Sequence, residues 1–281
     1  MRAHHGDRAR VYERAFLLSP EKRNQVMELW EVQKYGLDSF SDSGYVCIYG
    51  MAPAEWYGRQ IRLLARTAVE CVRDSLAELI GKDVESIIHQ VASGGEVIVF
   101  DPFAGSCNSL YWILRRVRNS KGIACELDRT IFDMTKRNLA SLDIDIELVN
   151  CDYRYLLNSH RYPLNHFIVV YVAPPWGDAL NEITGLDLRR TEPPVAEIVD
   201  NVEDVHKEQR ILWVIQVHQT VEPSSLAELE GRFAWSLLRI YDLNVKGMKH
   251  GILFGTSRWK PATNIRPSVF GLRSDGRPSG R

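Results

Sequence analysis

Short, nearly continuous apolar runs recur from Val97 onward, and segments with helical spacing of apolar residues separate them. Such runs, rich in β-branched residues, predict strands that are buried on both faces, as in a parallel sheet. The clearest runs cover residues 97–101, 122–126, 167–173 and 210–217. Two later runs, 237–243 and 250–256, flank Gly247 and predict an antiparallel pair at the end of the sheet. The alternation of strands and helices indicates an α/β fold.

Upstream of these runs the apolar residues follow a helical period. Ser19-Pro20-Glu21 is a helix start, with serine at the cap and proline at the first helical position. This helix is expected to run to Tyr35, with its buried face made by apolar residues at helical spacing: Val26, Leu29 and Trp30. Pro53 begins a second predicted helix over residues 54–80, and Gly81 is expected to end it.

These patterns divide the chain into three parts. Residues 1–92 are expected to form an N-terminal helical extension that lies as a lid over the active site. Residues 93–260 hold the predicted sheet and form the core. Residues 261–281 are rich in Arg, Pro, Gly and Ser, which predicts a mobile tail.

The first predicted strand ends at Asp101, and a small-residue turn, Phe103-Ala104-Gly105, leads to a helix that includes Asn108. Strand, turn and helix form the first unit of a sheet that binds its ligand at the carboxyl ends of the strands. The small residues allow close approach of a ligand to the backbone. Glu126 ends the next strand, roughly 20 residues after the turn, where an acid takes the ribose hydroxyls of a nucleotide. Asp128 is the alternative ribose ligand, and helix capping is the alternative role of Asp101.

The turn differs from the dinucleotide-binding pattern and reads Asp-Pro-Phe-Ala-Gly. With Asn150-Cys151-Asp152 after a third strand and Ala173-Pro174-Pro175-Trp176 after a fourth, it resembles the class I S-adenosylmethionine (SAM) methyltransferases, especially those that methylate exocyclic amines. The resemblance implies a Rossmann-like class I methyltransferase sheet, mostly parallel with the last strand antiparallel. It also implies SAM as cofactor, with its methionine portion near Asp101 and the turn, and its adenine near Asp152.

The four residues from Ala173 to Trp176 are the catalytic segment that this resemblance implies. The family carries Asp, Asn or Ser where Ala173 stands, so the backbone carbonyls of Ala173 and Pro174 are left to orient the target nitrogen. The prolines Pro174 and Pro175 restrict the backbone before Trp176, which favours a rigid stacking platform for a planar target. Core packing is the alternative role of this tryptophan.

A narrower resemblance comes from segments on both sides of this motif. Lys34-Tyr35 with the following aromatic loop, Met51-Ala52-Pro53, Gly177-Asp178 and Leu186-Asp187-Leu188-Arg189 resemble the trimethylguanosine synthases. Those enzymes use SAM to methylate the exocyclic amine of the RNA cap guanosine. The resemblance implies that substrate is bound by Tyr35, Trp176, Asp178 and Arg189.

Charge bears on the choice of acceptor. The net charge is −1, whereas a protein that grips several phosphates usually carries a basic excess. A planar or amine-bearing small molecule is therefore the leading acceptor, and the RNA cap is the alternative. Ala173 keeps open a third reaction, in which SAM itself is the substrate through its aminocarboxypropyl chain. A non-catalytic module that binds SAM or RNA is the fourth hypothesis.

The remaining patterns favour a cytoplasmic protein without metal. No apolar run is long enough to span a membrane, and the N-terminus has no apolar signal core. The five cysteines form no Cys-x-x-Cys pair, which favours reduced thiols. The histidines at positions 89, 206 and 250 show no metal-binding spacing, and His218 is interpreted as an edge residue, with a catalytic base as the alternative.

Overall fold

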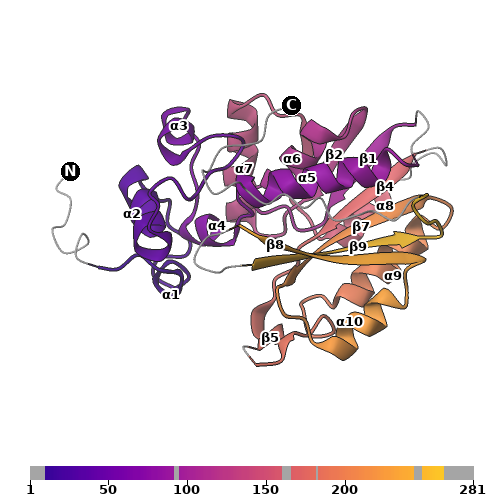
Figure 1. The fold of residues 1–281 in the computed structure, drawn as a ribbon. Helices are drawn as coiled ribbons and strands as arrows, with labels where there is room; N and C mark the ends of the chain where they lie inside the picture. Colours follow the sequence, from indigo (N-terminus) through magenta and orange to yellow (C-terminus); the bar gives the residue numbers. More distant parts are fainter. Residues whose placement is uncertain (1–9, 92–94, 160–165, 182, 244–248, 263–281) are drawn as a thin grey trace, which may run out of the picture.

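A seven-stranded sheet in the order β3-β2-β1-β4-β7-β9-β8 forms the centre of the computed structural model (Figure 1). The structure describes residues 10–91, 95–159, 166–181, 183–243 and 249–262. The strands of the sheet are β1 (Val97–Asp101), β2 (Ser120–Cys125), β3 (Ile146–Val149), β4 (Phe167–Val172), β7 (Arg210–His218), β8 (Trp235–Asp242) and β9 (Lys249–Ser257). The first five are parallel, and β9 runs antiparallel to both of its neighbours. The predicted α/β sheet, mostly parallel with the last strand antiparallel, is confirmed.

Helices cover both faces of the sheet because successive strand residues point to opposite sides. Val97 and Val99 of β1 belong to one apolar cluster, and Ile98 and Phe100 belong to the other. The first face packs against α5 (Asp74–Ile88), α6 (Asn108–Arg116) and α7 (Arg129–Ser141). The second packs against α8 (Tyr153–Ser159), α9 (Val195–Val205) and α10 (Pro223–Glu230). All six residues of β4 are buried, as the continuous apolar run predicts.

The parallel strands end at one edge, which we call the carboxyl edge. β1 ends there at Asp101, β2 at Cys125, and β7 at His218. The antiparallel β9 begins at the same edge, since His250 pairs with His218. Every predicted cofactor and catalytic residue therefore ends or follows a strand that terminates at this edge, where α/β sheets bind their ligands.

The predicted helix up to Tyr35 is wrong in both its bounds and its buried face. The structure has α1 (Arg14–Leu17) and then α2 (Leu29–Phe40). Residues 25–27 instead pair with residues 63–65, through Met27 N–H to the Leu63 carbonyl at 2.9 Å and a bridge between Val26 and Leu64. This pairing leaves Val26 45% exposed, and the register of α2 leaves Trp30 37% exposed.

The predicted helix over residues 54–80 is three helices. They are α3 (Pro53–Gly58), α4 (Ala65–Glu70) and α5. The chain leaves the helical conformation at Gln60, whose φ is 64°, and residues 61–64 are not helical. Gly81 does not end a helix but lies inside α5, where it allows close contact with α6. A Cβ added at this position would lie 2.8 Å from the Trp112 carbonyl oxygen.

The helices α1 to α4 form a group at one end of the sheet (Figure 1). Arg66 of α4 pairs with Asp128, which precedes α7, at 2.6 Å and so ties this group to the core. A short hairpin, β5 (Leu180–Asn181) and β6 (Gly185–Leu186), follows the catalytic segment. Residues 263–281 of the predicted tail lie outside the described residues. Within the described part of the chain, no helix is long and apolar enough to cross a membrane.

Candidate active site

The turn after β1 is held by hydrogen bonds across the first two strands. The Ala104 N–H donates to the Cys125 carbonyl at 2.9 Å. Gly105 has a φ of 48°, which favours glycine, and its carbonyl accepts from the Thr135 hydroxyl at 2.6 Å. An added Cβ at Gly105 would meet only the Phe103 carbonyl oxygen, at 4.0 Å. The turn is therefore fixed in shape while space remains beside the glycine.

Glu126 contacts this turn directly. Its carboxylate accepts from the Gly105 N–H at 3.0 Å and from the Asp128 N–H at 2.8 Å. Each oxygen keeps a further lone pair, so ribose hydroxyls can still bind. Burial raises the pKa of the carboxyl, and this effect outweighs the two N–H groups, which lower it. Glu126 thus lies where a ligand of the turn would meet it.

Asp128, the alternative ribose ligand, has a different environment. Its carboxylate caps α7 by accepting from the Thr130 and Ile131 N–H groups, and it pairs with Arg66. Burial favours a higher pKa, but the Arg66 guanidinium and the two N–H groups outweigh it and hold the pKa of Asp128 below its usual range. The structure gives Asp128 a structural role at the helix start.

Asp101 is a buried acid at the end of β1. Its Oδ1 accepts from the Phe103 N–H at 3.0 Å within the turn, and because α6 begins only at Asn108, with Cys107 at the cap position, the alternative role of Asp101 as a helix cap is wrong. Burial raises the pKa of this carboxyl to about 7; the Phe103 N–H opposes this shift, and the charge of Glu126 adds to it. A carboxyl whose pKa lies near neutral pH ionises readily when a cation binds beside it.

Asn108 anchors the N-terminal extension. Its Oδ1 accepts from the Tyr49 N–H at 2.7 Å, and its Nδ2 donates to the Val72 carbonyl at 2.8 Å and to Asp74 Oδ1 at 3.0 Å. The Tyr49 hydroxyl donates to the carbonyl of Ser106, inside the turn. The amide proposed from sequence as a cofactor contact is thus paired with protein groups, and the extension is joined to the turn.

Asp152 is an ion-pair partner at the end of β3. It accepts from the Arg154 guanidinium at 2.7 Å, and this hydrogen bond lowers the pKa of the aspartate. The neighbouring Asn150 donates to the carbonyls of Glu126 and Leu127 at 2.8 and 3.1 Å, which joins the ends of β2 and β3. The exposed Leu127 side chain lies at the same edge. Asp152 stands where an adenine contact is expected, but arginine already holds its carboxylate.

The segment from Ala173 to Trp176 follows β4 directly. Pro174 is buried, Pro175 is exposed, and Ala173 and Trp176 are half-buried. The Trp176 ring packs edge-on against His218, with centroids 6.0 Å apart. Its backbone carbonyl accepts from the Ala179 N–H at 2.8 Å in a short 3₁₀ turn. The ring is therefore held by neighbours on one side and accessible on another.

The predicted substrate residues do not all lie in one place. Tyr35 is buried in α2 against Phe40, and burial raises the pKa of its phenol to about 12. It belongs to the apolar core of the extension. Asp178 is exposed beside Trp176.

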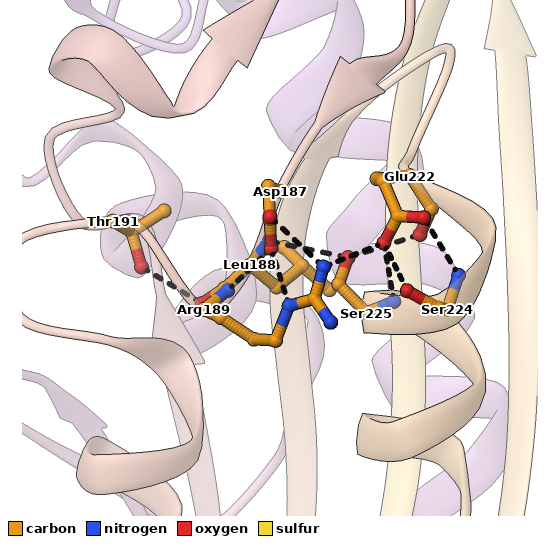
Figure 2. Close-up of polar contacts among 7 residues, drawn as sticks. All are labelled: Asp187, Leu188, Arg189, Thr191, Glu222, Ser224 and Ser225. Carbon is orange, nitrogen blue, oxygen red and sulfur yellow. Dashed lines mark hydrogen bonds and ion pairs between the residues drawn. The ribbon is translucent and has the colours of Figure 1, made fainter.

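Arg189 belongs to a polar network that holds the loop after the hairpin (Figure 2). Its guanidinium pairs with Asp187 at 2.9 Å and with Glu222 at 3.0 Å. Glu222 also caps α10 through the Ser224 and Ser225 N–H groups at 3.1 and 2.7 Å. Because this arginine is paired with two acids, its observed role is to join the loop to the start of α10.

Two residues near this edge were given no part in the site by sequence reasoning: Arg73 and His250. Arg73 precedes α5 and stacks on the Tyr45 ring, and its charge acts on His250. No local motif marks them, because they come together only when the extension packs on the sheet.

All five cysteines are free thiols. In the part of the chain that the structure describes, no group of three or more His, Cys, Asp or Glu residues could hold a metal.

Comparison with known proteins supports the fold. No family model and no curated protein sequence matches the chain. Among solved structures, the N-terminal domain of human METTL16 in complex with SAH matches with a TM-score of 0.52 and 13% identity, over 90% of this chain and 97% of that one. A delta-N METTL16 MTase domain matches with a TM-score of 0.48 and 17% identity, over 66% of this chain and 84% of that one. At such identities the likeness shows the fold alone, which is that of the class I methyltransferases.

Proposed function

We propose that this protein is a SAM-dependent methyltransferase that acts on a nitrogen of a planar or amine-bearing small molecule. The observation that carries the proposal is the arrangement at the carboxyl edge. The Glu126 carboxylate binds the Gly105 N–H, so an acid and an open glycine turn stand together at the ends of β2 and β1. The neighbouring β4 is followed directly by Ala-Pro-Pro-Trp.

The residues present fit the cofactor. Glu126 keeps lone pairs for the ribose hydroxyls, and Asp101 supplies a buried carboxyl near the turn that receives the methionine portion. A cationic sulfonium suits a site with two acids whose pKa values burial raises, since its charge favours their ionised forms. When bound, SAM supplies a methyl group that is already activated for displacement.

The chain then has to align the acceptor and exclude water. Trp176 offers a ring on which a planar acceptor stacks, and His218 fixes its orientation. The carbonyls of Ala173 and Pro174 are backbone acceptors beside this ring, and they orient the N–H groups of the target amine. The amine loses its proton after methyl transfer, so the mechanism needs no dedicated base.

Other reactions remain as alternatives at the same site. The RNA cap guanine-N2 amine is a planar target of the same kind, in a larger and more anionic substrate. The Ala173 side chain cannot accept a hydrogen bond from an amine, which keeps open the transfer of the aminocarboxypropyl chain of SAM. A non-catalytic SAM-binding module would use the turn and Glu126 only.

Mass spectrometry of the nucleoside products distinguishes these reactions. The protein is incubated with SAM alone, with a panel of amine-bearing heteroaromatic compounds, and with a methylated cap dinucleotide. We expect S-adenosylhomocysteine only in the presence of a small acceptor. Trp176→Ala should raise the KM for that acceptor about tenfold or more, through lost stacking, while the Kd for SAM changes little.

Each other outcome contradicts the proposal. Methylthioadenosine formed from SAM alone, above a blank without protein, would identify chemistry on the aminocarboxypropyl chain, whose own carboxylate displaces the sulfur and leaves as homoserine lactone. Turnover with the cap dinucleotide only would identify the RNA cap reaction. SAM that binds and stays intact with every acceptor would favour the non-catalytic module.

A further inference from the structure

Arg73 is a buried cation without an anionic partner among the described residues. The residue is only 8% exposed. The guanidinium makes no ion pair or side-chain hydrogen bond to any residue in the described ranges, and it lies over two aromatic rings. Its central carbon lies 3.8 Å from the centroid of Tyr45 and 5.6 Å from that of Phe40. Stacking leaves the N–H donors of the guanidinium unused, and an unpaired buried charge is costly.

Tyr45 adds a second unsatisfied group at the same place. The residue is 9% exposed, and its buried hydroxyl has no hydrogen-bond partner in the described part of the chain. Its ring stacks on Phe40 with centroids 3.5 Å apart and planes inclined by 17°, which fixes the position of the phenol. A buried hydroxyl without a partner in a native fold calls for a ligand or water.

The nearest acid in the sequence does not neutralise Arg73. The Asp74 carboxylate accepts from the Gly50 N–H at 2.9 Å, from Asn108 Nδ2 at 3.0 Å and from Trp112 Nε1 at 2.6 Å. It is therefore directed at the N-terminal extension and α6.

The backbone places Arg73 beside the glycine turn. Asn108, which starts the helix after the turn, binds both Val72 and Asp74, the two neighbours of Arg73. On the other side, burial, the charge of Arg73 and His218 lower the pKa of His250, at the start of β9, to about 4. Arg73 thus lies at the carboxyl edge, between the glycine turn after β1 and the end of β7.

We propose that the Arg73 guanidinium and the Tyr45 hydroxyl form a binding site for a carboxylate or phosphate group of a ligand held at the carboxyl edge. A planar guanidinium matches either group with two parallel hydrogen bonds, and the phenol donates a third. Two sources supply such an anion: the α-carboxylate of SAM, or an acidic group on the acceptor. This inference rests on the proposed function for the identity of the ligand but not for the presence of the anion site.

The test compares the variant Arg73→Met with a control variant, Arg62→Met, which changes a second stacked arginine. Arg62 also stacks on a tyrosine, Tyr57, at 3.6 Å, but its guanidinium donates to the carbonyls of Tyr57 and Ile61 at 2.8 and 2.7 Å. Arg62→Met is therefore the control for loss of a stacked arginine that is already satisfied. Tyr45→Phe removes only the hydroxyl and keeps the ring, and thermal melting checks the fold of every variant.

Calorimetry with SAM and with decarboxylated SAM separates the two sources. If the anion is the cofactor's carboxylate, Arg73→Met weakens SAM binding about tenfold or more and leaves binding of decarboxylated SAM within about twofold. If the anion belongs to the acceptor, both cofactors bind the variant normally, and inorganic phosphate stabilises the S-adenosylhomocysteine-saturated wild type but not Arg73→Met. Tyr45→Phe should show the same pattern with a smaller effect, and Arg62→Met neither.

Phosphate is also titrated into the protein without cofactor, which separates this inference from the proposed function. Stabilisation of the wild type but not of Arg73→Met supports the anion site even if SAM does not bind at all. The proposal is overturned if Arg73→Met folds and matches Arg62→Met in all four titrations: SAM, decarboxylated SAM, and phosphate with and without S-adenosylhomocysteine.

Discussion

Two acids at the ends of neighbouring strands set the electrostatics of the candidate site. Asp101 and Glu126 are both withdrawn from water, and burial raises the pKa of each carboxyl. The Glu126 carboxylate is stabilised by two backbone N–H groups, whereas Asp101 accepts from one. Asp101 is therefore the acid whose protonation is expected to change near neutral pH.

SAM affinity should rise with pH through about 7. In the free protein the Asp101 pKa is raised to about 7, so the carboxyl is protonated below this pH. A bound sulfonium favours the carboxylate, so binding releases a proton and weakens as pH falls, by at most about tenfold per unit. Folding stability depends on pH in the opposite direction to SAM affinity. Because the pKa of Asp101 is higher in the folded than in the unfolded protein, its contribution to stability is lost as pH rises from about 4 to about 7.

Calorimetric Kd values at pH 6, 7 and 8 check this prediction. Asp101→Asn is the control, because it keeps the size of the side chain and removes its titration. The variant should show a flat profile over this range. A wild-type Kd that is equally flat would show that Asp101 does not couple to cofactor binding.

The sequence predicts the position of some candidate residues and not of others, for physical reasons. The position of Glu126 beside the glycine turn could be predicted because it directly follows a strand, whereas the structure gives the nearby Asp128 a capping role. The burial of Tyr35 could not be predicted, because it depends on how α2 packs. Arg73 carries no local signal, since its lack of an anionic partner within the described ranges depends on residues far away in the chain.

The sequence likewise predicts some helices and strands and not others. The central strands β1, β4 and β7 could be predicted because each is a nearly continuous apolar run that is almost entirely buried. The helices before Asp74 could not, because the pairing of residues 25–27 with 63–65 and the left-handed conformation of Gln60 depend on tertiary contacts. Local helical spacing persists across these breaks and therefore predicts helices that are too long.

The contact between α5 and α6 depends on Gly81. A Cβ at this position would lie 2.8 Å from the Trp112 carbonyl oxygen and 3.1 Å from the Arg116 Cγ. We expect Gly81→Ala to lower the free energy of unfolding by about 1–3 kcal/mol, because the strain of overpacking exceeds the helix propensity that alanine gains. Urea denaturation measures the change.

Gly58 provides the matched control for this substitution. It is the last residue of α3, and an added Cβ would have no atom within 4 Å. Gly58→Ala should leave stability unchanged or slightly increased. If Gly81→Ala is as stable as the wild type, the close helix contact does not require glycine.

At the scale of the whole molecule, the fold brings separate segments to one edge of the sheet. The Tyr49 hydroxyl binds the turn at Ser106, and Asn108 binds the start of α5. The N-terminal extension therefore supports the glycine turn after β1. The class I topology explains why the turn, Glu126 and the Ala-Pro-Pro-Trp segment meet, although they follow different strands.

The most direct test of the account is calorimetric titration of SAM into the wild type, Glu126→Gln and Asp128→Asn. We predict saturable binding by the wild type, and a Kd about tenfold or more higher for Glu126→Gln, which loses charge-assisted contacts to the ribose. Asp128→Asn should bind within about twofold of the wild type but melt at a lower temperature, because it weakens the α7 cap and the Arg66 pair. No binding by the wild type, or unchanged binding by Glu126→Gln, would contradict a cofactor site at this edge.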